Sequence, residues 1–62
     1  MRNDVSKVRN EQGLTQEELS TMAKISRPYL SDIERDKAEP SGNVIFRIAR
    51  ALGKAVESIF FV

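Results

Sequence analysis

The sequence contains neither cysteine nor histidine. Without cysteine, a small fold has no disulfide bond and no thiolate-bound metal ion to stabilise it. Without histidine it also lacks the commonest general base, so catalysis would depend on carboxylates, lysines and a single tyrosine. No convergent pair of carboxylates is evident in the sequence. We therefore predict that the protein is not an enzyme, has no small-molecule substrate, and binds neither a metal ion nor another cofactor.

Long apolar segments are missing as well. No stretch approaches the roughly 20 apolar residues of a transmembrane helix, and the first residues lead into no apolar signal segment. This pattern predicts a cytoplasmic protein with no membrane partner. The chain has ten lysines and arginines and nine acidic residues, which gives a net charge of +1. A charge so close to zero does not by itself indicate a nucleic-acid partner, so such a role depends on where the charged side chains point.

The length of 62 residues suits one small domain, which we place at residues 1–62. Its most informative part is residues 16–35, predicted to form two short helices joined by a tight turn. Leu19, Met22 and Ala23 have the i, i+3, i+4 spacing of one buried helix face. Thr15 and Glu18 have the spacing of a capping box at the start of that helix.

The second helix of this pair is predicted to begin after Ser26, a good N-cap residue. Pro28 falls in its first turn, where the missing N–H does little harm. Leu30 and Ile33 give this helix an apolar stripe, and its remaining surface is polar. Two adjoining helices of this kind are typical of a helix-turn-helix, whose second helix enters the DNA major groove.

The polar face of the second helix supplies candidate contacts to DNA bases. Arginine can bond to guanine O6 and N7 together, aspartate can accept from cytosine N4, and proline offers only apolar contact. The candidate base contacts are Arg27, Pro28, Ser31 and Asp32. The alternative is a solvated helix face in which Asp32 pairs with Arg35 at i+3.

Three segments resemble the Xre family of phage and bacterial repressors, the lambda-repressor and Cro type. They are Gly13-Leu-Thr-Gln-Glu-Glu-Leu, Tyr29-Leu-Ser-Asp-Ile-Glu-Arg and Ile48-Ala-Arg-Ala-Leu-Gly. The resemblance extends over roughly residues 5–60. It implies an all-α, five-helix, lambda-repressor-like DNA-binding domain.

The other helices are predicted from caps and apolar spacing. A first helix begins near Asn3 or Asp4 and runs to about residue 12, with Val5 and Val8 facing inward. A fourth helix follows Ser41 as its N-cap and ends at Leu52, with Gly53 as the C′ residue and Ile45, Ile48, Ala49 and Leu52 as its core stripe. Residues 56–60 are predicted to form a short fifth helix, with Phe60 filling the core.

The resemblance also implies particular contacts. It places Thr15 and Gln16 beside a phosphate, as expected where free N–H groups at a helix start favour an anion; alternatively, Thr15 serves only as a cap. The other candidate phosphate contacts are Tyr29, Arg35, Lys37 and Asn43. Tyr29 has a second interpretation, packing beside Ile33. Arg9 is implied to form a structural ion pair with Glu34, the alternative being a phosphate contact.

The C-terminal part of the chain is more apolar than one small core requires, and such a surplus often marks a partner surface. The candidate interface residues for a homodimer are Phe46, Ile59, Phe61 and Val62. The alternative is that the last two residues form a frayed tail.

These observations predict sequence-specific binding of double-stranded DNA by a small dimeric transcription regulator, a repressor that reads a palindromic operator. The alternative function is a protein-interaction adaptor or antitoxin-type module with the same fold. The sequence identifies neither the operator nor the biological system.

Overall fold

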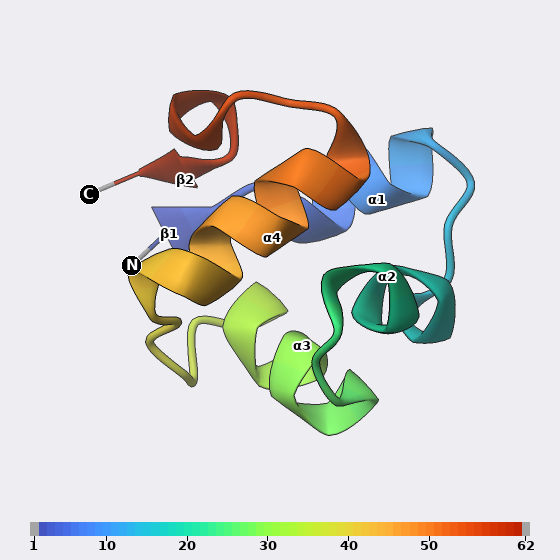
Figure 1. Ribbon diagram of the computed structural model, residues 1–62, viewed down its shortest axis with the longest axis horizontal. Helices are drawn as coiled ribbons and strands as arrows, with labels where there is room; N and C mark the ends of the chain where they lie inside the picture. The colour runs from blue at the N-terminus through green and yellow to red at the C-terminus, as the bar shows by residue number, and fades with distance from the viewer. Residues whose placement is uncertain (1, 62) are drawn as a thin grey trace.

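Four α-helices follow one another along residues 2–61, the part of the chain that the computed structural model describes (Figure 1). A single 3-10 turn and a two-stranded antiparallel sheet complete this part of the chain. The elements in order are β1 (Arg2–Asn3), α1 (Val5–Glu11), α2 (Gln16–Ala23), α3 (Arg27–Glu34), α4 (Gly42–Leu52), η1 (Val56–Ser58) and β2 (Phe60–Phe61).

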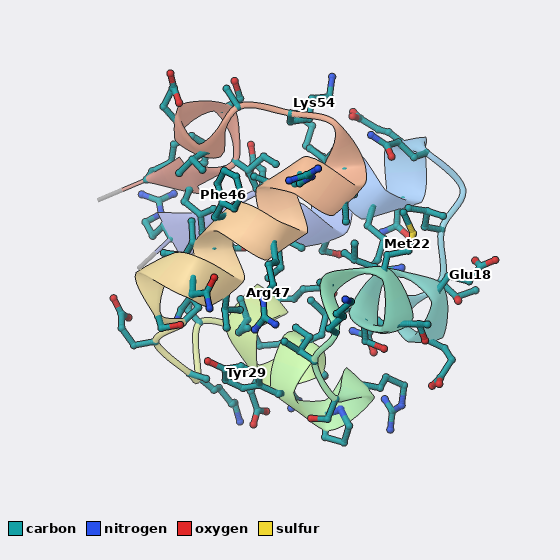
Figure 2. The ribbon with its side chains drawn as sticks, in the orientation of Figure 1. Glu18, Met22, Tyr29, Phe46, Arg47 and Lys54 are labelled. Carbon is teal, nitrogen blue, oxygen red and sulfur yellow. The ribbon has the colours of Figure 1, made fainter. Side chains whose placement is uncertain are left out.

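The predicted helix caps are confirmed at α2, α3 and α4. At α2, the Glu18 N–H donates to the Thr15 hydroxyl at 3.0 Å, and the Thr15 N–H donates to the Glu18 carboxylate at 2.8 Å. Figure 2 shows Glu18 on α2. Ser26 and Ser41 accept in the same way from backbone N–H groups at the starts of α3 and α4. Each cap satisfies a donor that a helix start leaves unpaired.

The start of α1 is capped by a neighbouring residue. Asp4 occupies the N-cap position but forms no capping bond with its side chain. Instead the Asn3 side-chain oxygen accepts from the Val5 N–H at 3.0 Å. The Asn3 amide nitrogen also donates to the Ile33 carbonyl at 2.9 Å. Asn3 therefore connects the start of α1 to the end of α3.

Two helices end on residues other than glycine in the left-handed conformation. Lys24 follows α2 with φ 60°, and Asp36 follows α3 with φ 59°. Both ends have a Schellman bond, from the Ile25 N–H to the Ser20 carbonyl at 3.0 Å and from the Lys37 N–H to the Asp32 carbonyl at 2.8 Å. These bonds satisfy carbonyls at the helix ends and turn the chain sharply.

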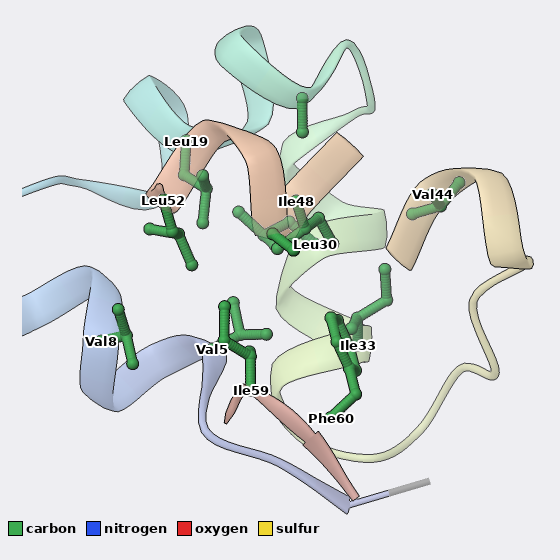
Figure 3. Close-up of a cluster of buried hydrophobic side chains, with 12 residues drawn as sticks. Val5, Val8, Leu19, Leu30, Ile33, Val44, Ile48, Leu52, Ile59 and Phe60 are labelled. Atoms are coloured by element: carbon green, nitrogen blue, oxygen red, sulfur yellow. The ribbon is translucent and has the colours of Figure 1, made fainter. Parts of the chain in front are cut away.

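Helix α4 packs against α1, α2 and η1, around one core (Figure 3). The core consists of Val5, Val8, Leu19, Ala23, Leu30, Ile33, Val44, Ile48, Ala49, Leu52, Ile59 and Phe60. The predicted core positions of α1 and α3 and the predicted core residue Phe60 are therefore confirmed.

The predicted fifth helix is wrong. Residues 56–58 form only a 3-10 turn, and no side chain caps it because Ala55 has no acceptor. The chain then becomes extended, and residues 60–61 pair with residues 2–3. The fold is thus a helical helix-turn-helix fold with a small sheet that joins the two ends of the described chain.

Two predictions of burial are also corrected, those for Met22 and Ile45. Met22 is 50% exposed, because α2 turns Leu19, Ser20 and Ala23 inward instead. On α4, Val44 is buried and Ile45 only partly so. The small Ser20 lies inside because its hydroxyl donates to the Glu17 carbonyl at 2.9 Å, which satisfies its only donor.

Replacing Lys24 by glycine is expected to stabilise the fold. The left-handed conformation costs a residue with a Cβ atom about 1–2 kcal/mol, partly offset by the greater unfolded-state entropy of glycine. We expect Lys24→Gly to raise the free energy of unfolding in urea by about 0.5–1 kcal/mol. Lys24→Ala removes the same charge but keeps Cβ and should change little. An equal gain in both variants would show that backbone strain is not the cause.

Candidate nucleic-acid interface

A largely buried ion pair lies beneath the helix-turn-helix and joins α1 to α3. Arg9 Nε donates to Glu34 Oε2 at 2.8 Å, and Arg9 Nη2 donates to Glu34 Oε1 at 3.2 Å. The two side chains are only 11% and 4% exposed. Arg9 Nη1 also donates to the Leu14 carbonyl at 2.8 Å, in the loop before α2. The structure thus brings together the two residues expected to pair, and Arg9 is held inside the fold.

Gln16 extends this network to the start of α3. Its Nε2 donates to Glu34 Oε1 at 3.0 Å, and its Oε1 accepts from Arg27 Nη1 at 3.4 Å. The first residue of α2 therefore contacts the first residue of α3. The sequence places Gln16 only beside a phosphate and does not predict these contacts. No local pattern indicates them, because the partners lie far from Gln16 in the sequence.

The four candidate base contacts all lie on α3, and they differ in accessibility. Arg27 and Pro28, in its first turn, are exposed, while Ser31 and Asp32 are partly buried. Asp32 Oδ1 accepts from Arg35 Nη2 at 3.1 Å, so the alternative i, i+3 pair is formed in the unbound protein. Both side chains of this pair are about half exposed, at 46% and 60%. Exposed pairs contribute little stability, so DNA can displace this one at low cost.

The candidate phosphate contacts occupy several elements. Those that are exposed are Thr15, Arg35, Lys37 and Asn43. The Thr15 hydroxyl already accepts a bond within the capping box, which leaves its donor available. Tyr29 is partly buried against the core, in agreement with its packing interpretation. This packing does not specify a contact for the Tyr29 hydroxyl.

The candidate dimer residues do not form one exposed set. Phe46 on α4 is 55% exposed, and Phe61 on β2 is 39% exposed. Ile59 is completely buried in the core of its own chain, so its assignment to an interface is wrong. Val62 lies outside the described residues. The apolar surplus inferred from the sequence is therefore smaller, because η1 and β2 place Ile59 and Phe60 in the core.

Residues 2–61 contain no group of three or more acidic side chains close enough to hold a metal ion. In the same part of the chain, no helix has the length and apolar character needed to cross a membrane.

A family model described as helix-turn-helix matches residues 5–59. The chain belongs to the Xre-like helix-turn-helix family. The resemblance noted in the sequence is therefore confirmed, and with it the class of DNA-binding regulators. This is not a family of enzymes.

Relatives of this helix-turn-helix chain include both longer and similarly short proteins. It is 44% identical over 55 residues to the immunity repressor protein of Bacillus phage phi105, covering 89% of this chain but only 38% of the repressor. It is 40% identical over 63 residues to an uncharacterised HTH-type transcriptional regulator of Methanothermobacter thermautotrophicus, covering 100% of this chain and 91% of that protein.

Among solved structures, the fold is similar to the restriction-modification controller protein C.AhdI from Aeromonas hydrophila. The TM-score is 0.87 at 28% sequence identity, with 90% of this chain and 85% of the controller covered. The likeness therefore extends over nearly the whole of both chains.

Removing Glu34 should be far more damaging than removing Asp32, although both acidic residues lie on α3 and pair with arginine. Glu34→Ala leaves the guanidinium of Arg9 largely buried and unpaired, which we expect to cost about 3–5 kcal/mol. Asp32→Ala breaks an exposed pair and should cost at most about 1 kcal/mol. Urea denaturation followed by circular dichroism measures both values. Similar losses in the two variants would contradict a structural role for the Arg9–Glu34 pair.

Proposed function

We propose that the protein binds double-stranded DNA in a sequence-specific manner, as a small dimeric transcription regulator that represses by occupying an operator. The observation that carries this proposal is the helix-turn-helix, in which residues 24–26 join α2 to α3 and the polar face of α3 is accessible. Helix α3 would lie in the major groove, with its N-terminal residues at base edges.

Arg27 is the principal residue of this proposal. It is exposed in the first turn of α3, where the helix start is fixed by the Ser26 cap. Its contact with Gln16 holds the guanidinium in one region of space before DNA binds. A side chain positioned in advance loses less conformational entropy on binding. A bidentate contact from Arg27 to guanine would then contribute most of the base discrimination.

Asp32 and Arg35 supply further contacts to DNA. Because their mutual bond is exposed and weak, Asp32 can turn to accept from cytosine N4 while Arg35 turns to a phosphate. After the exchange, Arg35 is paired with a phosphate, and the Asp32 carboxylate is hydrogen-bonded to a base. Lys37, in the loop that follows α3, and Asn43, in the first turn of α4, contact the DNA backbone.

A dimer increases the discrimination that one helix supplies. Each good bidentate contact is worth about 1–3 kcal/mol, so a single α3 distinguishes few sequences. Two copies related by a two-fold axis read a palindrome with half-sites about 34–36 Å apart. The exposed aromatic side chains of Phe46 and Phe61 support such an interface. A DNA ligand is consistent with the expected cytoplasmic location.

Selection of bound sequences from a pool of random duplexes tests the proposal. We expect a palindrome to be retained. Arg27→Ala should weaken its binding by about 1–3 kcal/mol for each half-site and relax the preference at one position of each half-site. Arg50→Ala, which removes another exposed arginine outside the proposed interface, is the matched control and should bind as before. Absence of binding by the folded protein at low salt would favour the alternative, a protein-interaction module.

Sedimentation equilibrium tests the dimer separately. Phe46→Glu and Phe61→Glu each place a charge where the proposed interface excludes water, so both variants should sediment as monomers. Met22 is the third large apolar side chain that is exposed in the described chain. Met22→Glu serves as the control and should remain dimeric. Loss of the dimer in all three variants, or in none, would contradict the proposed interface.

A further inference from the structure

A shallow hollow of about 520 Å³ lies between α2 and α4, outside the proposed DNA interface. We call it the α2–α4 hollow, and its lining residues are Met22, Lys24, Arg47, Arg50 and Ala51. Met22 and Arg47 are labelled in Figure 2, on α2 and α4. None of the five is a candidate DNA contact: Lys24 lies in the turn between α2 and α3, and the other four lie on α2 and α4.

The charge of the α2–α4 hollow has one sign. Lys24, Arg47 and Arg50 border it, and no carboxylate does. None of these three cations forms an ion pair or a side-chain hydrogen bond with another residue of the described chain. In a protein with a net charge of +1, three unpaired cations around one hollow form a local excess of positive charge. This excess favours an anionic partner.

Arg47 provides the most specific observation. Its Nε is buried yet has no hydrogen-bond partner among the described residues. A buried donor without a partner costs free energy, and a donor of a charged group costs more. A carboxylate entering the hollow would also offset the positive charge of the Arg47 guanidinium.

The apolar part of the hollow indicates the rest of the partner. Met22 is 50% exposed on α2, and the partly buried Ala51 faces it from α4. Methionine is common on surfaces that accommodate protein partners, because its side chain is flexible and polarisable. Adjacent helices often hold an amphipathic helix in the groove between them. The hollow is open, so a small organic anion would bury little of its surface there.

The positive charge of the α2–α4 hollow disfavours a second copy of this chain as its partner. A two-fold contact through this face would bring each set of three cations against the same set on the partner. Like charges opposed across an interface are unfavourable. A two-fold dimer through this face is therefore disfavoured, and a negatively charged partner is favoured.

We propose that the α2–α4 hollow docks an acidic amphipathic segment of a partner protein. An apolar side chain of that segment packs on Met22 and Ala51, while its carboxylates pair with Lys24, Arg47 and Arg50. The proposal goes beyond DNA binding, because it gives the protein a surface through which a second protein is held beside the DNA. It stands on the hollow alone and does not require the dimer.

An NMR titration of the ¹⁵N-labelled protein tests the docking surface. The probe is a synthetic helical peptide of about 16 residues, roughly four turns, with leucine on one face and glutamate beside it. Its matched control has every glutamate replaced by glutamine. We expect the acidic peptide to shift the amide signals of the five lining residues, and the glutamine peptide to bind about tenfold more weakly or worse.

Charge-reversal variants give the second readout. Lys24→Glu and Arg50→Glu should each weaken binding of the acidic peptide by about fivefold or more. Lys7→Glu makes the same change at an exposed site on α1 and should bind the peptide like the unmodified protein. Circular dichroism verifies that all three variants are folded.

The proposal is overturned if millimolar acidic peptide does not shift the amide signals of the lining residues, or if the two peptides bind equally well. It is also overturned if Lys7→Glu weakens peptide binding as much as the two hollow variants do. Shifts centred on Arg27 and Arg35, abolished by any duplex, would also overturn it, since the peptide would then only imitate DNA. Failure of the duplex selection leaves the peptide result unaffected, so the two proposals can fail separately.

Discussion

The paired charges of Arg9 and Glu34 connect parts of the molecule that are far apart in the chain. The guanidinium reaches from α1 to α3 and to the loop before α2, and the carboxylate also receives the amide of Gln16. Because both groups are nearly buried, neither can move without leaving a charge unpaired. The relative placement of α1, α2 and α3 therefore depends on this contact, and through Gln16 so does the position of Arg27.

What sequence alone predicts correctly here is mainly local. The caps at Thr15, Ser26 and Ser41 and the stop at Gly53 depend on residues within one turn, so these four boundaries could be inferred from their neighbours. The choice between Met22 and Ser20 as the inward residue could not, because it depends on how α2 is rotated against α4.

The long-range features were missed for the same reason. Gln16 and Asn3 have few distinguishing marks in the sequence, and their partners are set by the tertiary fold. The sequence shows that the C-terminal residues are apolar but does not distinguish a partner surface from the core, which Ile59 completes. Net charge is also a poor guide, since it conceals one paired set of charges at α3 and one unpaired set around the α2–α4 hollow. The number and sign of the charged side chains follow from the composition, but which of them pair with each other depends on the fold.

The small sheet between β1 and β2 has a consequence for how the molecule opens. Arg2 lies opposite Phe61, so nearly the entire chain forms one loop closed by this contact. Closing so long a loop is entropically costly unless the helices have already brought its ends together. The sheet should thus form last and open first, yet while it is formed neither end can fray without the other. When β1 and β2 separate, both terminal segments therefore lose their pairing at the same time.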